Sequence, residues 1–372
     1  MIHSSRIFGV STWGEILLFQ TSSLFFSIIL MFGTEIYGLR EISKYISNRN
    51  EIFKIINQIF HLRIINYLTF SLISFLTFFF YKLNLSSFLI INFWTLSLII
   101  SPLWIYTALG RLNHFFFIEV ITKLLTFVII YFNVMQEKDN YLIIIILISS
   151  NYLLNTASLI KIRRYIFIYR LKTTEIKKIY QKTIPFFIIQ FCANVFTSFP
   201  ILIVGFTLGS TQAAIFGNGE RIFRIFRSLY SPINRVVLKF SSSNNFTNKN
   251  LKKGFLVAGL GGILLFIIGV IFVIFFIEIA LGEKYIGSKG ISLILMLSLP
   301  FVYISNQILH SYIYPMNNEL FFMKTLLWLT PVNIIMLLSL APMFQTYGTA
   351  ISMVIAELLL FVSFFKFIKS KL

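Results

Sequence analysis

Long apolar stretches separated by polar connections run through the whole of this sequence. About 11 of them reach about 20 residues, the length of helix that crosses the hydrocarbon core of a bilayer. The predicted spans are 13–32, 60–81, 88–106, 115–134, 141–160, 184–206, 211–231, 255–277, 286–309, 321–340 and 348–367. The chain is therefore predicted to be an all-α membrane protein.

The predicted span 211–231 differs from the others because it carries several charges. It reads TQAAIFGNGERIFRIFRSLYS and contains Glu220, Arg221, Arg224 and Arg227. At about 100° per residue, Glu220, Arg224 and Arg227 fall on one side of the helix, while most of the large apolar side chains point elsewhere. This helix is predicted to have one polar face.

Free energies indicate what that polar face contacts. An Arg near mid-membrane costs about 2.5–3.5 kcal/mol, whereas each Ile, Leu or Phe returns about 0.3–0.6 kcal/mol. The apolar neighbours therefore do not offset Arg221, Arg224 and Arg227, and we expect these side chains to line a water-filled cavity and to bind an anionic cargo. The alternative is that Arg221 or Arg227 reaches the membrane interface or pairs with Glu220.

Composition excludes most other classes of protein. With 57% hydrophobic and 12% charged residues and a mean hydropathy of +0.85, the chain lies outside the range of soluble proteins. The net charge of +19 comes mainly from bases between the apolar spans, so it indicates membrane topology and no nucleic-acid partner. The single cysteine, the scattered histidines, the single aspartate and the absence of a GxxxxGK[ST] loop predict no metal, no cofactor and no enzyme activity.

The bases alternate between the two ends of the predicted spans. By the positive-inside rule the base-rich connections are cytoplasmic, which puts the C-terminus in the cytoplasm and the first residues outside. Such a start favours an additional amino-terminal helix that this sequence lacks, which would make 12 spans. We expect an N-terminal helical lobe at 1–160, a basic cytoplasmic linker at 161–183 and a C-terminal helical lobe at 184–372.

Three segments resemble a known family when taken together. They are SRIFGVST at 5–12, FGTEIYGLREIS at 32–43 and FGNGERIFRIFRSLYSPINRVVLKF at 216–240. They are similar to the polysaccharide-exporter flippases, the O-antigen repeat-unit translocases of the multidrug/oligosaccharidyl-lipid/polysaccharide superfamily.

The resemblance implies a V-shaped transporter of two helical bundles, like the multidrug and toxin extrusion transporters. It implies alternating access and the translocation of a polyprenyl-diphosphate-linked oligosaccharide, the repeat unit of an O-antigen or capsule in lipopolysaccharide-type biosynthesis, across the bacterial inner membrane. The implied partners are that lipid-linked oligosaccharide, the membrane lipids and polysaccharide polymerase machinery.

Further polar residues are candidates for the transport site. Arg40 belongs either to a capped, solvated helix end or, as the resemblance suggests, to an entry gate for lipid headgroups, and the position of Arg63 allows it to join either arrangement. Gln190 and Asn194 lie four residues apart, where they either contact sugar hydroxyls in the cavity or hydrogen-bond between helices.

Charged residues within other spans are candidates for ion coupling. Glu119 and Lys123 are four residues apart, which predicts an ion pair on one helix face. Glu357 has no base within one turn of its own helix, so it either carries a coupling proton as an unpaired acid or pairs with a base such as Lys324 on another helix.

Two other functions stay open. A cation or drug antiporter of the same superfamily would need a cavity lined by acids, whereas the span 211–231 carries three Arg and one Glu. A membrane polysaccharide polymerase usually carries a large external loop, whereas the external connections predicted here are short. The sequence does not identify the sugar, the coupling ion or the oligomeric state.

Overall fold

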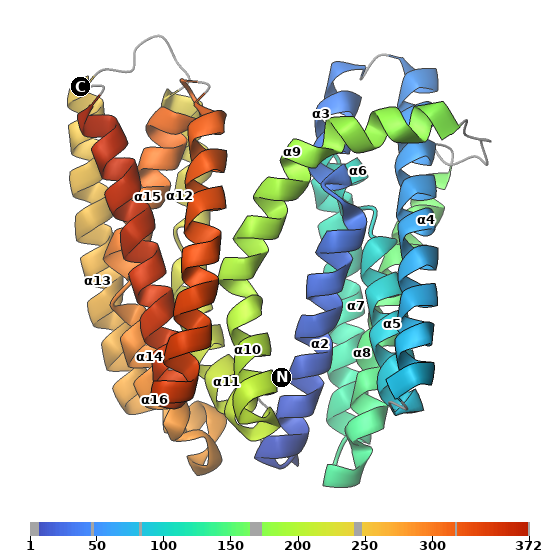
Figure 1. The fold of residues 1–372 in the computed structure, drawn as a ribbon, viewed down its shortest axis with the longest axis horizontal. Helices are drawn as coiled ribbons and strands as arrows, with labels where there is room; N and C mark the ends of the chain where they lie inside the picture. The colour runs from blue at the N-terminus through green and yellow to red at the C-terminus, as the bar shows by residue number, and fades with distance from the viewer. Residues whose placement is uncertain are drawn as a thin grey trace. The chain divides into compact units, whose positions relative to one another are not determined.

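The computed structural model describes residues 7–45, 48–81, 84–163, 173–241, 248–316 and 318–370, and within these ranges helices and their connections make up the whole structure. The helices, drawn in Figure 1, are α2 (Val10–Met31), α3 (Thr34–Lys44), α4 (Arg49–Tyr81), α5 (Leu85–Ile99), α6 (Leu103–Ala108), α7 (Leu112–Asn133), η1 (Glu137–Asp139), α8 (Asn140–Lys161), α9 (Thr173–Thr197), α10 (Phe199–Leu208), α11 (Ser210–Ser228), α12 (Ser231–Ser241), α13 (Asn248–Leu281), η3 (Glu283–Tyr285), α14 (Gly287–Met296), α15 (Leu299–Ile308), the π-helical turn η4 (Leu309–Ile313) and α16 (Glu319–Lys369). The prediction of an all-α protein is confirmed.

Each of the predicted spans coincides with a helix or with a pair of consecutive helices. In the described ranges, eight helical segments are long and apolar enough to cross a membrane, or nine if the bent pair α9–α10 is one span. Helix α11 is not among them, because its charges lower the hydropathy of the segment. The helix predicted at 211–231 is confirmed, but its length and apolar composition do not identify it as a membrane span.

The last two predicted spans form one long element, α16, with a break inside it. A straight helix of its 51 residues would be about 76 Å long, more than twice the hydrocarbon core of about 30 Å. The break lies at Phe344 and Gln345, whose dihedral angles are not helical, and Gln345 has a φ of 53°. Figure 1 draws two helical arms, in orange-red and dark red, on either side of it.

Proline positions explain other breaks. Pro200 and Pro300 lie in the first turn of α10 and α15, where a residue without an N–H costs no helical hydrogen bond. The axis bends by 48° between the α9 segment and α10. Pro185 lies inside α9. Two of these three prolines therefore lie at the start of a helix, and one lies inside a helix.

The helices group into two compact units. Unit 1 contains Phe19–Asn194, and unit 2 contains residues 7–18 together with Val195–Leu372. The predicted lobes had a boundary within 161–183 and placed residues 7–18 in the first lobe. In the structure, the described part of that basic segment from Thr173 onward is the first part of α9, so it is helical and belongs to unit 1.

Backbone contacts explain why the first part of α2 belongs to unit 2. A Cβ atom at Gly14 would lie 1.8 Å from the carbonyl oxygen of Ser210, so the backbones of α2 and α11 touch there. The indole Nε1 of Trp13 donates a hydrogen bond of 3.2 Å to Oδ1 of Asn218 on α11. A glycine in one predicted span thus permits a contact with another span nearly 200 positions later.

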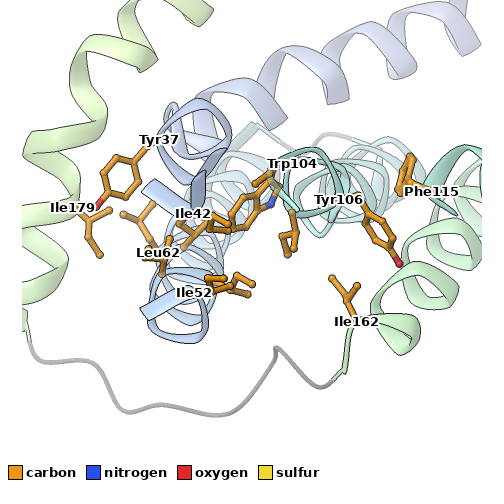
Figure 2. Packing of buried hydrophobic residues seen from close by; sticks show 14 of the residues in the cluster. Tyr37, Ile42, Ile52, Leu62, Trp104, Tyr106, Phe115, Ile162 and Ile179 are labelled. Atoms are coloured by element: carbon orange, nitrogen blue, oxygen red, sulfur yellow. The ribbon is translucent and has the colours of Figure 1, made fainter. Parts of the chain in front are cut away.

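Unit 1 has a core of aliphatic and aromatic side chains from α3, α4, α6 and the ends of α7, α8 and α9 (Figure 2). Tyr37 and Trp104 lie within it, and the turn before α3 packs close to α9. Gly33 in that turn has a φ of 70°, and a Cβ there would lie 2.4 Å from the backbone nitrogen of Phe187. Phe32 and Gly33 of the 32–43 segment therefore make a left-handed turn, and at Gly33 the backbone of α9 leaves no room for a side chain.

Candidate functional site

Helix α11 buries most of its surface within unit 2. Its buried side includes small residues that allow close packing, and the buried set is Ala213, Ala214, Phe216, Gly217, Asn218, Gly219, Glu220, Ile222, Phe223 and Phe226. The exposed side includes Arg224 and Ile225. The predicted separation of faces is thus correct for Arg224 but not for Ile225, which is 61% exposed beside it.

Arg224 and Glu220 form a pair of hydrogen-bonded charges on this helix. Nη2 of Arg224 lies 2.7 Å from Oε1 and 2.6 Å from Oε2 of Glu220, and Nε lies 3.0 Å from Oε1. The Glu220 side chain is 4% exposed and the Arg224 side chain 52% exposed. Spacing of four residues brings the two groups together, and the buried carboxylate fixes the direction of the guanidinium. The remaining donors of Arg224 stay at the surface of unit 2.

Arg227 pairs with Glu357, a residue of the second arm of α16. Nη1 of Arg227 lies 2.9 Å from Oε1 of Glu357, and the two side chains are 32% and 12% exposed. Of the two readings of Glu357, the structure shows the one in which it pairs with a base of another helix, and that base is Arg227 instead of Lys324. The sequence could not show this, because the partners lie 130 positions apart on helices that only the fold brings together.

Arg221 lies beside Trp13 and makes a different contact. Its guanidinium carbon is 5.5 Å from the centre of the Trp13 ring, within range of a cation–π interaction. Trp13 also donates to Asn218, one turn earlier on α11. Neither Trp13 nor Asn218 was among the sequence candidates, although a tryptophan at the start of a predicted span and an asparagine before the charged run are both visible in the sequence.

The charges of this site nearly balance. Arg221, Arg224 and Arg227 face two carboxylates, Glu220 and Glu357, in place of the single acid that the sequence suggested. One positive charge remains in excess among these five side chains, which we call the α11 cluster. Because guanidinium groups present paired donors, the exposed part of the site is suited to bind the oxygens of a phosphate or carboxylate.

Arg63 lies in unit 1 and its guanidinium is held by protein acceptors. Its side chain is 1% exposed, Nε donates to Thr34 at 2.9 Å, and Nη1 donates to the carbonyl oxygens of Ile99 at 2.8 Å and Ser101 at 3.4 Å. Ile99 is the last residue of α5, so Arg63 satisfies carbonyls that the helix end leaves without partners. Nη2 lies 3.8 Å from the Glu35 carboxylate. These contacts support a structural role for Arg63, and its assignment to the substrate cavity stays a prediction.

The remaining candidate residues lie on helices other than α11. Arg40 is exposed on α3 in unit 1. Glu119 and Lys123 on α7 are not among the ion pairs within 4 Å in the part of the chain that the structure describes, so the predicted pair is wrong. Gln190 is half-buried and Asn194 is buried on α9, and their contact with sugars stays a prediction.

The described helices define the class of this protein as a multi-pass, all-helical membrane protein. A scan against protein-family profiles and a search of curated proteins find no match. Among solved structures, the chain is similar to lipid II flippase MurJ in an inward closed conformation, with a TM-score of 0.70, 15% identity, and coverage of 99% of this chain and 86% of that chain.

A second solved structure has the same fold. It is the outward-facing conformation of a multidrug resistance MATE family transporter of the MOP superfamily, with a TM-score of 0.56, 13% identity, and coverage of 97% of this chain and 87% of that chain. At such identities the similarity concerns the fold. The predicted all-helical, MATE-like fold is confirmed, whereas membership of the superfamily and of its polysaccharide-exporter branch stays a prediction.

Proposed function

We propose that this protein is a flippase that moves a polyprenyl-diphosphate-linked oligosaccharide, the repeat unit of an O-antigen or capsule, across the bacterial inner membrane by alternating access. The observation that carries the proposal is the half-exposed guanidinium of Arg224, held in place by buried Glu220 on a helix of membrane-spanning length. Contact between an exposed guanidinium and lipid hydrocarbon at such a position costs free energy. This cost favours an aqueous environment and an anionic ligand for Arg224.

Each part of the proposal has its own support. The fold is that of structures whose names describe a lipid II flippase and a multidrug transporter. The excess positive charge of the α11 cluster matches a diphosphate better than a cation. The base-rich connections support a cytoplasmic C-terminus. The membrane lipids and a polysaccharide polymerase are the proposed partners.

The alternative functions are less well supported by the same contacts. A cation antiporter needs carboxylates that are available to cations, yet both Glu220 and Glu357 pair with Arg. A polymerase usually carries catalytic groups on a large external segment. The connection from α7 to α8 is short, because α7 ends at Asn133 and α8 begins at Asn140.

The test is flipping of a fluorescent polyprenyl-diphosphate oligosaccharide in liposomes that contain the purified full-length protein. Loss of one charge-assisted contact to the diphosphate corresponds to about 1.5–3 kcal/mol, so Arg224→Gln is expected to weaken apparent affinity roughly 10- to 100-fold. Arg111→Gln is the matched control, because Arg111 is an exposed Arg at the start of α7 outside the site. Equal affinity for both variants would refute the site, and absence of flipping by the unaltered protein would refute the function.

A further inference from the structure

A cavity of about 410 Å³ lies on the side of unit 1 between α4, α5 and α8. Its wall is mostly apolar and includes Phe60, Ile64 and Leu96, while Arg63 also borders it. The core of unit 1 faces the other side of α4, through residues such as Ile52, Ile56 and Ile59. The cavity includes none of the α11 residues, and it borders the core of unit 1, because Phe60 and Leu159 pack against that core as well as lining the cavity.

The cavity opens toward the surface that contacts lipid. Ile64 on its rim is 52% exposed, and the next turns of α4 continue this face with the exposed side chains Leu68, Leu72 and Phe79. In a membrane-spanning helix, such a row of large apolar side chains contacts hydrocarbon. A hydrocarbon chain can therefore leave the bilayer and enter the cavity sideways.

Polarity changes along the length of the cavity. Asn57 and His61 line the end nearer the start of α4, and the Nδ1 atom of His61 lies 2.8 Å from the carbonyl oxygen of Asn57. Leu159 lines the same cavity from the last turn of α8, and Lys161 and Arg163 follow it directly. An occupant with an apolar tail and a polar head fits this gradient.

The two bases beyond Leu159 select the charge of that head. Lys161 and Arg163 are exposed, and in the described ranges neither belongs to an ion pair within 4 Å. Lys161 is the last residue of α8 and Arg163 lies two positions beyond it, so both bases lie at the end of the helix that carries Leu159. Bases near the membrane surface attract anionic lipid headgroups.

We propose that this cavity is a binding site for an anionic phospholipid of the bilayer, with an acyl chain between α4, α5 and α8 and the headgroup phosphate near Lys161 and Arg163. The site goes beyond the flippase function, because it binds a resident lipid on unit 1 and includes none of the α11 residues. Bound lipid fills an apolar cavity that the side chains leave open. Its acyl chain packs against α4, α5 and the end of α8 at once.

The experiment uses full-length protein in nanodiscs with a phosphatidylglycerol that carries a photoreactive diazirine in its acyl chain, and mass spectrometry locates the crosslinks. In Ile64→Trp the larger indole fills the rim of the cavity. We expect it to exclude about two methylene groups of the acyl chain, which corresponds to a roughly tenfold loss of crosslinking at α4 and α5. Ile73→Trp is the matched control, since Ile73 is equally a lipid-facing Ile of α4 outside the cavity. Equal crosslinking in both variants would overturn the proposal.

A second arm tests the headgroup and the identity of the lipid. Lys161→Gln is expected to lower the preference for phosphatidylglycerol over phosphatidylcholine about fivefold, whereas Lys138→Gln beyond the other end of α8 leaves it unchanged. Equal labelling by both phospholipids in the unaltered protein would contradict the headgroup assignment. Displacement by polyprenyl phosphate, but not by unlabelled phosphatidylglycerol, would assign the cavity to an isoprenoid lipid and overturn the proposal. None of these outcomes depends on flipping.

Discussion

Replacement of Arg63 by Met separates a structural role from a transport role at this position. The change keeps much of the side-chain length and removes every donor of the guanidinium. The carbonyl of Ile99 then loses its 2.8 Å donor, and Thr34 loses the donor at 2.9 Å. Since Arg63 is 1% exposed, water does not replace these contacts without opening the core.

The size of the effect follows from the contacts. Hydrogen bonds that involve a charged group are worth about 1.5–3 kcal/mol each, so loss of the two short ones costs about 3–6 kcal/mol. The contact with Glu35 adds little, because the carboxylate is 34% exposed and lies 3.8 Å away. At about 2–4 °C per kcal/mol for a domain of this size, the Tm falls by about 10 °C.

The assay is thermal unfolding of the purified protein in detergent, followed by the fraction that stays monodisperse. Arg40→Met is the control, because Arg40 is exposed on α3 and its replacement is expected to change stability by less than about 0.5 kcal/mol. If Arg63→Met unfolds at the temperature of the control but abolishes flipping, the structural account of Arg63 is refuted.

Two further predictions concern unit 2. Gly14→Ala is expected to lower the Tm by several degrees, because its Cβ would lie 1.8 Å from the Ser210 carbonyl oxygen. Gly261→Ala on α13 is the control. A Cβ at Gly261 would have no atom within 4 Å, so this change is expected to leave the Tm unchanged or to raise it slightly. A thermal melt of both variants checks this. For Arg227 and Glu357, a double-mutant cycle with Gln at each position is expected to give a coupling free energy of about 1 kcal/mol, and additive effects on unfolding would show that the 2.9 Å pair contributes nothing.

The positions of the helices could be predicted from the sequence because each apolar stretch has the length of a bilayer span. The charged helix α11 was also visible, since Glu220, Arg224 and Arg227 share a face at helical spacing, and the Arg224–Glu220 pair follows from spacing of four residues. Features of this kind depend only on residues within one helix, so they can be predicted without knowing which other helices pack against it.

Contacts between distant helices could not be predicted in the same way. Glu357 looked unpaired because no base lies within one turn of it, and its partner Arg227 belongs to another helix. The contact at Gly14 is of the same kind, because it brings the first part of α2 against α11 through the backbone, which hydropathy does not record. Glu119 and Lys123 show the reverse error, in which a favourable spacing did not produce a pair.

The two Arg–Glu pairs of unit 2 respond differently to movement. Arg224 and Glu220 share α11, so their pair persists when neighbouring helices shift, and Arg224 keeps its direction at the surface. Arg227 and Glu357 join α11 to the second arm of α16, so separation of these helices breaks their pair. Because Arg227 is about a third exposed, solvent screening keeps this pair weak, near 1 kcal/mol. A diphosphate with several acceptor oxygens can therefore compete with Glu357 for Arg227 while Arg224 stays in place, which couples anion binding to the contact between α11 and α16.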